Sequence, residues 1–384
     1  MKIGVYPADV EGCGHYRLIW PAFALHEEGY DVEVIPPAQR GNSFSASIDE
    51  ETDDVEGVKI PDKYDVIVFQ RISNKYLAQA IPFIVRMGIG VVIDIDDDLE
   101  SIHWSNPAFA NLHPRSGQPG SLTAKHNWTW TRYAIDHASM VTVSSEALFQ
   151  RYCRRRPETS AIIRNYVPEH YLAIQREQRL GHLVGWGGSM RAHFDDVPVL
   201  GDSVRRIIKA GFDFRVVGPP EGVRDALKLN AEPDHTGGVD LEHWPDALAQ
   251  LDIGLAPLSD SRFNKSKSWL KPLEYAAVGV PCVMSPRDEY REIHKYGIGT
   301  LAAKPNEWYQ AMKTLLTNDA LREERSQRGR EVVARHLTIQ NNVHQWADVW
   351  TRTPFNPDRK RTLVPVMNGA IGVFRSNVPR KSAG

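Results

Sequence analysis

Lys267, Lys271 and Glu274 stand close together in the segment FNKSKSWLKPLEYAAVGVP, residues 263–281. The proline suits the first position of a helix and the glycine suits the position just past its end, which predicts a short helix over Pro272–Val278. The free N–H groups at the start of such a helix attract an anion, and the two lysines add full positive charge. Glu274 can accept hydrogen bonds from hydroxyls, so the set suits a diphosphate that carries a ribose. The alternative is a helix with solvated lysines and a Glu that interacts only with its own dipole.

A glycine-rich loop in the same half of the chain supports a phosphate site. Gly187, Gly188 and Ser189 follow a strand predicted over His182–Trp186, and Arg191 comes directly after them. Glycines let a ligand approach the backbone closely, and an arginine can bind phosphate with two parallel hydrogen bonds. An ordinary strand-to-helix turn with an exposed arginine is the alternative. The loop lacks the GxGxxG pattern, and no acidic residue ends a clear second strand about 20 residues later, which disfavours a nicotinamide enzyme.

Short apolar runs alternate with helical segments along both halves of the chain, which is typical of parallel sheets covered by helices on both faces. In the first half we predict strands at Ile3–Tyr6, Val32–Ile35, Val66–Phe69, Val91–Ile95, Val141–Val143 and Ala161–Ile163. The second half repeats the pattern with His182–Trp186, Phe214–Val217, Ile253–Ala256, Cys282–Met284 and Thr300–Ala302. The repetition predicts an α/β protein with two Rossmann-like domains in tandem.

The domain boundary is placed in the polar stretch Glu169–Gly181. We predict a first domain over residues 1–175, a second over 176–340, a helix over 341–352 and a basic tail over 353–384. Helices are expected over Tyr16–Glu28, after a loop at Asp9–His15, over Val197–Ala210, and over Asn306–Trp350 with breaks near Asn318 and Thr338. An irregular segment is expected over Glu100–Ala124.

Composition and charge narrow the class of protein further. The chain has 384 residues and a formal net charge of -2, which excludes a polybasic protein whose whole surface binds nucleic acid. The cysteines Cys13, Cys153 and Cys282 are too far apart for a disulfide framework or a CxxC metal pattern, so a reducing compartment is expected. Asp9 comes too early for a signal peptide, and no apolar run approaches the ~18 residues of a membrane helix. We therefore expect a soluble cytoplasmic protein.

Several motifs occur in an order that carries a resemblance. They are GCGHYRLIWPAFAL, VIDIDDDLE, VTVSSE followed by RNYVP, GWGGSMR and, most specifically, FNKSKSWLKPLEYAAVGVP. Over about residues 1–350 the sequence resembles the GT-B-fold glycosyltransferases near glycosyltransferase family 4, in the versions found in bacteria and bacteriophages. The resemblance implies two Rossmann-like domains facing each other across a cleft. It also implies a nucleotide-sugar donor on the second domain and a last helix, around Val343–Trp350, that crosses back onto the first.

The resemblance also implies roles for single residues. Arg191 and Lys267 resemble the cationic pair on the donor diphosphate, Glu274 resembles the ribose-binding Glu, and Gly14 resembles the loop glycine that lets the first domain approach the phosphates. Gly187, Gly188, Ser189 and Lys271 complete the expected donor site. Where the family often has a first Glu, this chain has Ser266, so Asn264, Ser266 or backbone amides are the candidates for the contact to the donor sugar.

Acidic and imidazole side chains of the first half have several possible roles. Asp94 and Asp96 form a DxD pair that could hold a divalent metal, but they end a strand far along the sequence from the phosphate features, so we predict no metal site. The favoured interpretation is that these acids are solvated or cap helices. The third possibility is that Asp96 and Asp97 contact the acceptor. His15 and His103 are lesser candidates for contact with the acceptor or the donor sugar, because a lone loop histidine is more often plain polar surface.

The function implied is transfer of a sugar, with retention of configuration, from a nucleotide-diphosphate sugar to a hydroxyl acceptor. No cofactor or metal is expected. The acceptor could be a glycan, a protein, a small molecule or a hydroxylated DNA base; DNA enters because the tail beyond Thr351 is basic. The alternatives are a sugar-nucleotide epimerase of the same fold and a non-catalytic protein that binds nucleotides or nucleic acid.

Overall fold

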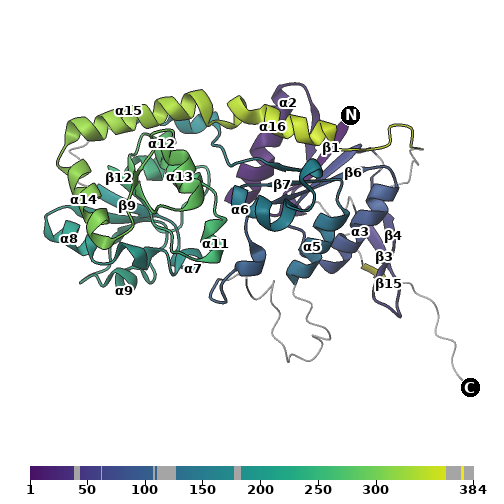
Figure 1. Ribbon diagram of the computed structural model, residues 1–384, viewed down its shortest axis with the longest axis horizontal. Coiled ribbons are helices and arrows are strands. Elements are labelled where there is room, and N and C mark those ends of the chain that lie inside the picture. Colours follow the sequence, from purple (N-terminus) through teal and green to yellow (C-terminus); the bar gives the residue numbers. More distant parts are fainter. Residues whose placement is uncertain are drawn as a thin grey trace, which may run out of the picture.

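Two parallel sheets form the centres of the two halves of the computed structural model, which describes residues 1–38, 44–61, 63–106, 109, 127–176, 183–359 and 373–375 (Figure 1). The strands of the first sheet, in spatial order, are β2 (Asp31–Val34), β1 (Lys2–Tyr6), β5 (Val66–Gln70), β6 (Gly90–Ile95), β7 (Met140–Val143) and β8 (Ser160–Ile162). Those of the second are β11 (Asp234–His235), β10 (Asp213–Val217), β9 (Leu183–Gly187), β12 (Ile253–Ala256), β13 (Cys282–Met284) and β14 (Thr300–Leu301). The predicted pair of parallel α/β halves is confirmed.

The strand order locates the ligand-binding edge of each sheet. In the second sheet the chain moves outward from β9 through β10 to β11, and then restarts on the other side of β9 with β12. The first sheet reverses in the same way between β1 and β5. Ligands of open α/β sheets bind beyond the carboxyl ends of the strands at such a reversal. The segments that follow β9 and β12, and those that follow β1 and β5, therefore form the expected ligand-binding edges.

Helices cover both faces of each sheet, so the central strands are buried along their whole length. The runs VIVFQ of β5 and GVVIDI of β6 are buried at every residue, as expected for parallel strands with two covered faces. The helical elements of the first half are α1 (Gly12–Gly14), η1 (His15–Ile19), α2 (Trp20–Glu27), α3 (Lys75–Arg86), η3 (Leu99–Ser101), α5 (Asn127–His137), α6 (Glu146–Leu148), η4 (Phe149–Cys153), η5 (Pro157–Thr159) and η6 (Glu169–Ala173).

The remaining helical elements follow β9 in the chain. They are α7 (Met190–His193), η7 (Val197–Leu200), α8 (Ser203–Lys209), α9 (Val223–Leu227), α10 (Trp244–Ala249), α11 (Arg262–Lys265), α12 (Leu270–Ala277), α13 (Asp288–His294), α14 (Pro305–Leu316), α15 (Asp319–His336) and α16 (Ile339–Arg352). The last three confirm the predicted helical run and its breaks at Asn318 and Thr338, because both residues cap the helix that follows. Trp308, Trp346 and Trp350 on these helices are fully buried.

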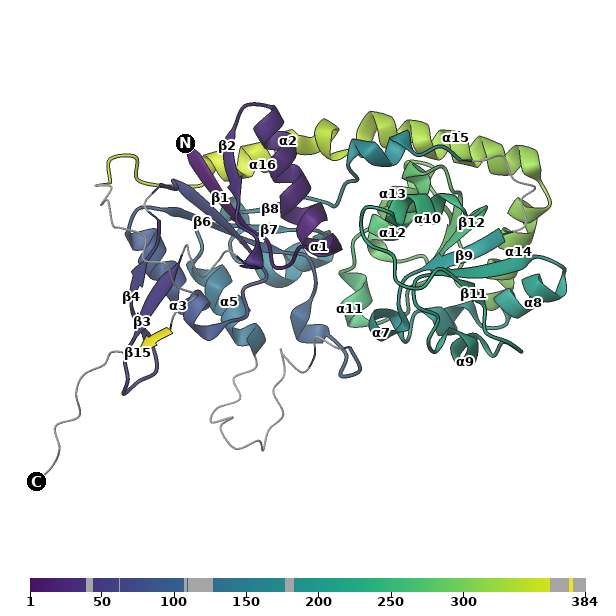
Figure 2. The ribbon, with the colours of Figure 1, turned by 180° about the vertical axis from the view of Figure 1, so that it is seen from behind.

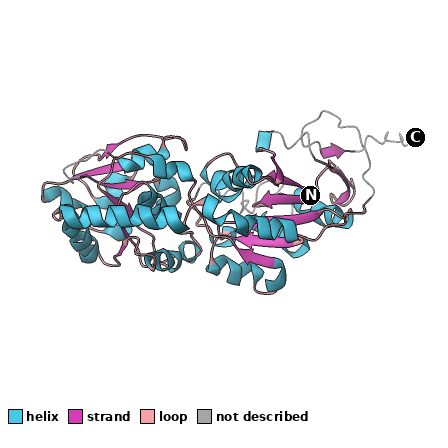
Figure 3. Ribbon diagram, turned by 90° about the horizontal axis from the view of Figure 1, so that it is seen from above, coloured by secondary structure: helices cyan, strands magenta, loops and turns pink. Residues whose placement is uncertain are grey.

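The chain returns to the first half through its last helices. α15 runs along the second half, and α16 continues onto the first, where it lies beside α2 (Figures 1 and 3). Trp346 of α16 donates a hydrogen bond from Nε1 to the backbone oxygen of Arg17, at 3.1 Å. Further contacts join the two halves directly, including Trp269 Nε1 to the oxygen of Asn165 at 2.6 Å. These contacts fix the cleft between the two sheets.

Several local predictions need correction. The first helix begins at Gly12 rather than Tyr16, because Asp9 accepts hydrogen bonds from the following backbone and starts the turn inside the expected loop. The helix predicted over Val197–Ala210 is broken at Gly201, whose φ of 57° lies in the left-handed region. The site helix starts at Leu270, before Pro272. The sequence reading missed a third sheet, formed by β3 (Ser45–Ile48) and β4 (Val55–Lys59) with β15 (Val373–Arg375) beside β3.

Two predicted features extend beyond the described residues. Most of the irregular segment over 100–124 lies outside them, as does most of the basic tail over 353–384. No helix in the described ranges is both long enough and apolar enough to cross a bilayer.

Candidate active site in the interdomain cleft

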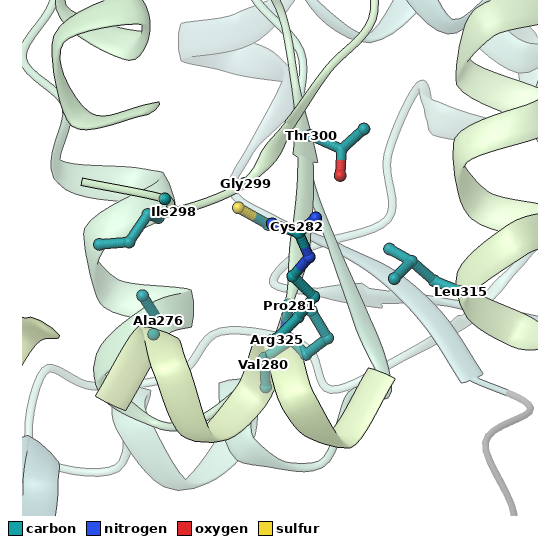
Figure 4. Close-up of a pocket in the computed structure, with 11 residues that line it drawn as sticks. Ala276, Val280, Pro281, Cys282, Ile298, Gly299, Thr300, Leu315 and Arg325 are labelled. Atoms are coloured by element: carbon teal, nitrogen blue, oxygen red, sulfur yellow. The ribbon is translucent and has the colours of Figure 1, made fainter. Parts of the chain in front are cut away.

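A cavity of about 340 Å³ lies between the two halves, at the carboxyl ends of both sheets. Figure 2 shows α1, which supplies one wall, on the side of the first half that faces α12, which supplies the other. Its lining is Glu11, Gly12, Cys13, Tyr16, Asp96, Asp97, Asn165, His193, Val239, Leu241, Trp244, Leu258, Lys267, Ser268, Leu270, Lys271, Glu274 and Tyr290. A second recess, behind α12, has a volume of only about 10 Å³, enough for one water molecule at most (Figure 4).

Lys267 joins the two halves across this cavity. Its Nζ lies 2.9 Å from Oδ1 of Asp97, which follows β6 of the first half. Burial opposes the charge on the lysine, but the carboxylate beside it raises the pKa of Lys267 above its usual value. The ammonium group is therefore charged, and in this conformation it forms an ion pair with a carboxylate of the first half.

Lys271 lies on the first turn of α12 and reaches back toward the end of β9. Its Nζ donates a hydrogen bond to the backbone oxygen of Gly187, the last residue of that strand. Burial lowers the pKa of Lys271, and an anion in the cavity would favour its charged form. The N–H group of Gly187 donates to Oη of Tyr275, at 2.9 Å, which fixes the strand end against α12.

Glu274 is the buried acid of the site. Oε1 accepts hydrogen bonds from Tyr16 Oη at 2.6 Å and from Trp244 Nε1 at 3.1 Å. Tyr16 in turn accepts from the hydroxyl of Tyr171. Burial raises the pKa of Glu274 to about 7. Across the part of the chain that the structure describes, no hydrogen bond reaches Oε2, so this oxygen is available to a ligand hydroxyl.

The acidic residues at the end of β6 and directly after it are paired with arginines. Asp94 is fully buried, and both its oxygens accept hydrogen bonds from Arg17, at 3.0 and 2.7 Å. Asp96 pairs with Arg71, which lowers the pKa of Asp96 although burial opposes its charge. The carboxylate of Asp98 pairs elsewhere, with Arg151 at 2.6 Å. Asp94 and Asp96 thus face different arginines rather than a common point.

The glycine-rich loop after β9 borders the site, but its arginine does not line the cavity. Gly188 donates a backbone hydrogen bond to Val217 at 3.0 Å, and Ser189 caps α7 by accepting from the N–H of Arg191 at 3.3 Å. The Arg191 side chain is exposed to solvent. His193, at the other end of α7, lines the cavity instead.

Asn264 and Ser266 are both buried, and neither is among the residues that line the cavity. Asn264 Nδ2 donates to Asp196 Oδ1 at 2.6 Å, and Ser266 Oγ donates to the backbone oxygen of Phe263 at 2.6 Å. The backbone oxygen of Ser266 accepts a hydrogen bond from Ser145 of the first half, at 2.9 Å. Their side chains are therefore engaged within the protein.

The remaining predicted residues lie on the first half. Gly14 accommodates a tight approach of the chain, because a Cβ there would lie 1.9 Å from the backbone oxygen of Asp9. Its neighbours Gly12 and Cys13, rather than Gly14, line the cavity. His15 packs against Trp20, and its Nδ1 bonds with the oxygen of Glu11 at 2.9 Å.

His103 stacks on Phe194 of the second half, with ring centroids 4.5 Å apart. Like His15, it lies outside the cavity lining. The structure therefore brings Asp96, Asp97, Lys267, Lys271 and Glu274 together around the cavity. The other predicted site residues do not line the cavity.

Sequence reasoning missed Tyr16, Arg71, His193 and Trp244. Tyr16 lies two residues after Gly14, directly behind the predicted loop, so its position was a usable signal. His193 lies two residues after Arg191, in the same loop-to-helix junction. Arg71 and Trp244 carried no such signal, because each reaches the site only through the folding of its own half.

A region of the second half matches a known protein family. Residues 200–348 match a family model described as "Glycosyl transferase-like". A comparison of the sequence with curated proteins finds no match.

Solved structures match over nearly the whole chain. Sucrose-phosphate synthase from Thermosynechococcus elongatus is 13% identical, with a TM-score of 0.60 over 92% of this chain and 98% of that one. Anabaena HepE, in complex with UDP and glucose, is 14% identical, with a TM-score of 0.59 over 92% and 100%. WaaG, a glycosyltransferase involved in lipopolysaccharide biosynthesis, is 14% identical, with a TM-score of 0.56 over 92% and 100%. The GT-B fold is confirmed, while the assignment to family 4 stays a prediction. The chain therefore has the GT-B fold, and its residues 200–348 are similar to the glycosyl transferase-like family.

Proposed function

We propose that this protein transfers a sugar from a nucleotide-diphosphate sugar to a hydroxyl acceptor, with retention of configuration and without a metal or other cofactor. The observation that carries the proposal is the grouping of Lys267, Lys271 and Glu274 around the start of α12, on one wall of the interdomain cavity. That wall lies at the strand reversal between β9 and β12, where α/β sheets bind nucleotides.

The cations suit the leaving group of the reaction. As the bond to the sugar breaks, the diphosphate gains negative charge, and groups that are already in place stabilise that charge most effectively. Lys267 and Lys271 would act in this way, together with the free N–H groups of α12. Arg191 is a further candidate, since it lies on the same short helix as the cavity residue His193.

The acid suits the nucleoside. Glu274 Oε2 can accept a hydrogen bond from a ribose hydroxyl, while Tyr16 and Trp244 hold Oε1. HepE, whose structures include complexes with UDP and with UDP-glucose, has the same fold. UDP-sugars are therefore the donors to test first.

The proposal that no metal and no separate base takes part depends on the partners of Asp94 and Asp96 and on the leaving phosphate. Asp94 and Asp96, the sequence candidates for a metal, are each committed to a separate arginine. An oxygen of the leaving phosphate can accept the proton of the acceptor hydroxyl, so the mechanism requires no separate base. The acceptor classes considered from the sequence stay open, DNA among them.

A donor assay tests the proposal. Thermal shift with a panel of nucleotide sugars should identify the donor, because a ligand of the native state raises its apparent stability. Release of free sugar from that donor, measured with and without EDTA, should then proceed at the same rate. Proton NMR of the first released anomer should show the configuration of the donor. Absence of any stabilising nucleotide sugar contradicts the donor assignment, and loss of turnover in EDTA contradicts metal independence.

The pair between Lys267 and Asp97 leads to a prediction about affinity. Asp97→Asn frees the lysine before the donor arrives, so UDP should bind about 3- to 10-fold more tightly, in line with the ~1 kcal/mol of a partly exposed ion pair. Isothermal titration calorimetry measures the change, with Asp213→Asn, an exposed acid at the start of β10, as the control. Weaker binding of UDP would show that Asp97 assists the donor instead of competing with it.

A further inference from the structure

His193 is held in a fixed orientation at the cavity wall. Its side chain is 19% exposed, and Nδ1 lies 2.7 Å from Oδ2 of Asp196. Asp196 is almost fully buried. Its other oxygen accepts hydrogen bonds from the N–H of Ser259 at 2.8 Å and from Asn264 Nδ2 at 2.6 Å. The carboxylate thus accepts hydrogen bonds on both oxygens, and the imidazole is one of its donors.

This network decides which nitrogen carries the proton. Burial opposes ionisation of Asp196, but the hydrogen bonds from His193, Ser259 and Asn264 hold the pKa of Asp196 below its usual range. An ionised carboxylate needs a donor, so Nδ1 carries the hydrogen. Burial lowers the pKa of His193, which leaves the ring neutral at pH 7. Nε2 is then an acceptor, and no hydrogen bond within the described ranges occupies it.

The neighbours of His193 indicate what Nε2 can bind. Lys267 and Lys271, the proposed diphosphate ligands, line the same cavity and act electrostatically on the ring. A neutral nitrogen acceptor cannot bind a phosphate oxygen, because neither atom carries a hydrogen. A hydroxyl beside the diphosphate is a suitable partner, and the sugar bonded to that diphosphate carries several.

The residues expected from the sequence to contact the sugar are engaged elsewhere. Ser266 Oγ donates within its own turn, and Asn264 supports the carboxylate of Asp196. Asn264 therefore acts on the cavity through His193. The chain Asn264–Asp196–His193 connects the buried interior of the second half to an acceptor atom at the cavity wall.

We propose that His193 is a specificity-determining residue, whose Nε2 accepts a hydrogen bond from a hydroxyl of the donor sugar, and that Asp196 is its positioning residue. The proposal rests on the proposed function, because it requires a nucleotide-sugar donor. It goes beyond that function in naming the part of the donor that His193 contacts.

Calorimetry with two ligands separates this role from others. In the His193→Ala variant, UDP-glucose should bind about tenfold more weakly, while UDP itself binds as it does to the unmodified protein. His193→Gln, which keeps an acceptor atom at a similar reach, should recover part of the affinity for UDP-glucose. Asp196→Asn should also weaken the binding of UDP-glucose. His344→Ala, at an exposed position on α16, is the matched control.

Deoxy analogues of the donor identify the hydroxyl. One deoxy form of UDP-glucose should bind the unmodified protein as weakly as UDP-glucose binds His193→Ala, with no further loss when the two changes are combined. If His193→Ala lost affinity for UDP and for UDP-glucose to the same extent, the proposal would be overturned, because this result indicates a phosphate contact or a structural role. Unchanged UDP-glucose binding with a lower kcat would overturn it in favour of a base. Failure of the unmodified protein to bind either ligand would contradict the proposed UDP donor instead.

Discussion

Lys267→Ala is expected to lower kcat by about 100- to 1,000-fold, because loss of one preorganised group that stabilises charge in the transition state has an effect of that size. Lys267 carries a full charge into the cavity at the start of α12, and its pKa lies above the usual value for lysine. Steady-state kinetics with the donor identified by thermal shift measure the loss.

The fold of this variant should survive. The pair between Lys267 and Asp97 is partly exposed, at 26% and 19% of the two side chains, so its loss should cost about 1 kcal/mol or less. For domains of this size that corresponds to a decrease in Tm of about 2–4 °C or less. Lys265→Ala, which removes an exposed lysine from α11, is the matched control and should keep full activity. Turnover like that of the unmodified protein in Lys267→Ala would contradict the assignment of the phosphate site.

Glu274→Gln is expected to weaken donor binding and to stabilise the protein at the same time. A carboxylate accepts a stronger hydrogen bond from a hydroxyl than a neutral amide does, so UDP should bind the variant about tenfold more weakly at pH 8. The pKa of Glu274 is about 7, so in the unmodified protein UDP affinity should also fall as the pH decreases through 7. In the variant this part of the pH dependence should disappear.

The stability effect has a definite sign. The pKa of Glu274 is raised from 4.5 to about 7 in the folded protein, so between these values the folded state keeps a proton that the unfolded state has lost. The free energy of unfolding therefore falls as the pH rises from 4.5 to 7. Glutamine carries no charge, so the variant should be more stable at pH 8 by roughly 3 kcal/mol, and by less than about 1 kcal/mol at pH 5.

Urea unfolding at the two pH values measures this difference. Glu221→Gln, at an exposed position, is the control and should change neither stability nor binding. A Glu274→Gln variant that is less stable at pH 8 would show that the hydrogen bonds from Tyr16 and Trp244 require the charged acid. Unchanged affinity for UDP in a stable variant would remove Glu274 from the donor site.

Residues near each other in the sequence were the ones whose grouping could be predicted. Lys267, Lys271 and Glu274 lie within one loop and the first turns of one helix, and local geometry alone places them at the same sheet edge. The alternation of strands and helices also follows from local patterns, because each period of apolar residues determines which faces of an element are buried. The split of the helix at Gly201 and the early start at Gly12 depended on local hydrogen bonds that the apolar pattern does not report.

Local sequence patterns were enough to predict the α/β class, the two tandem halves and the grouping of two lysines and an acid on the second half. The groups that surround these residues became known only from the folded chain. Asp97 meets Lys267, and Tyr16 meets Glu274, across contacts that join distant parts of the chain. Asn264 turns inward to Asp196, and through it His193 is directed at the cavity. Such pairings arise when two separately formed sheets dock, and no local periodicity encodes that docking.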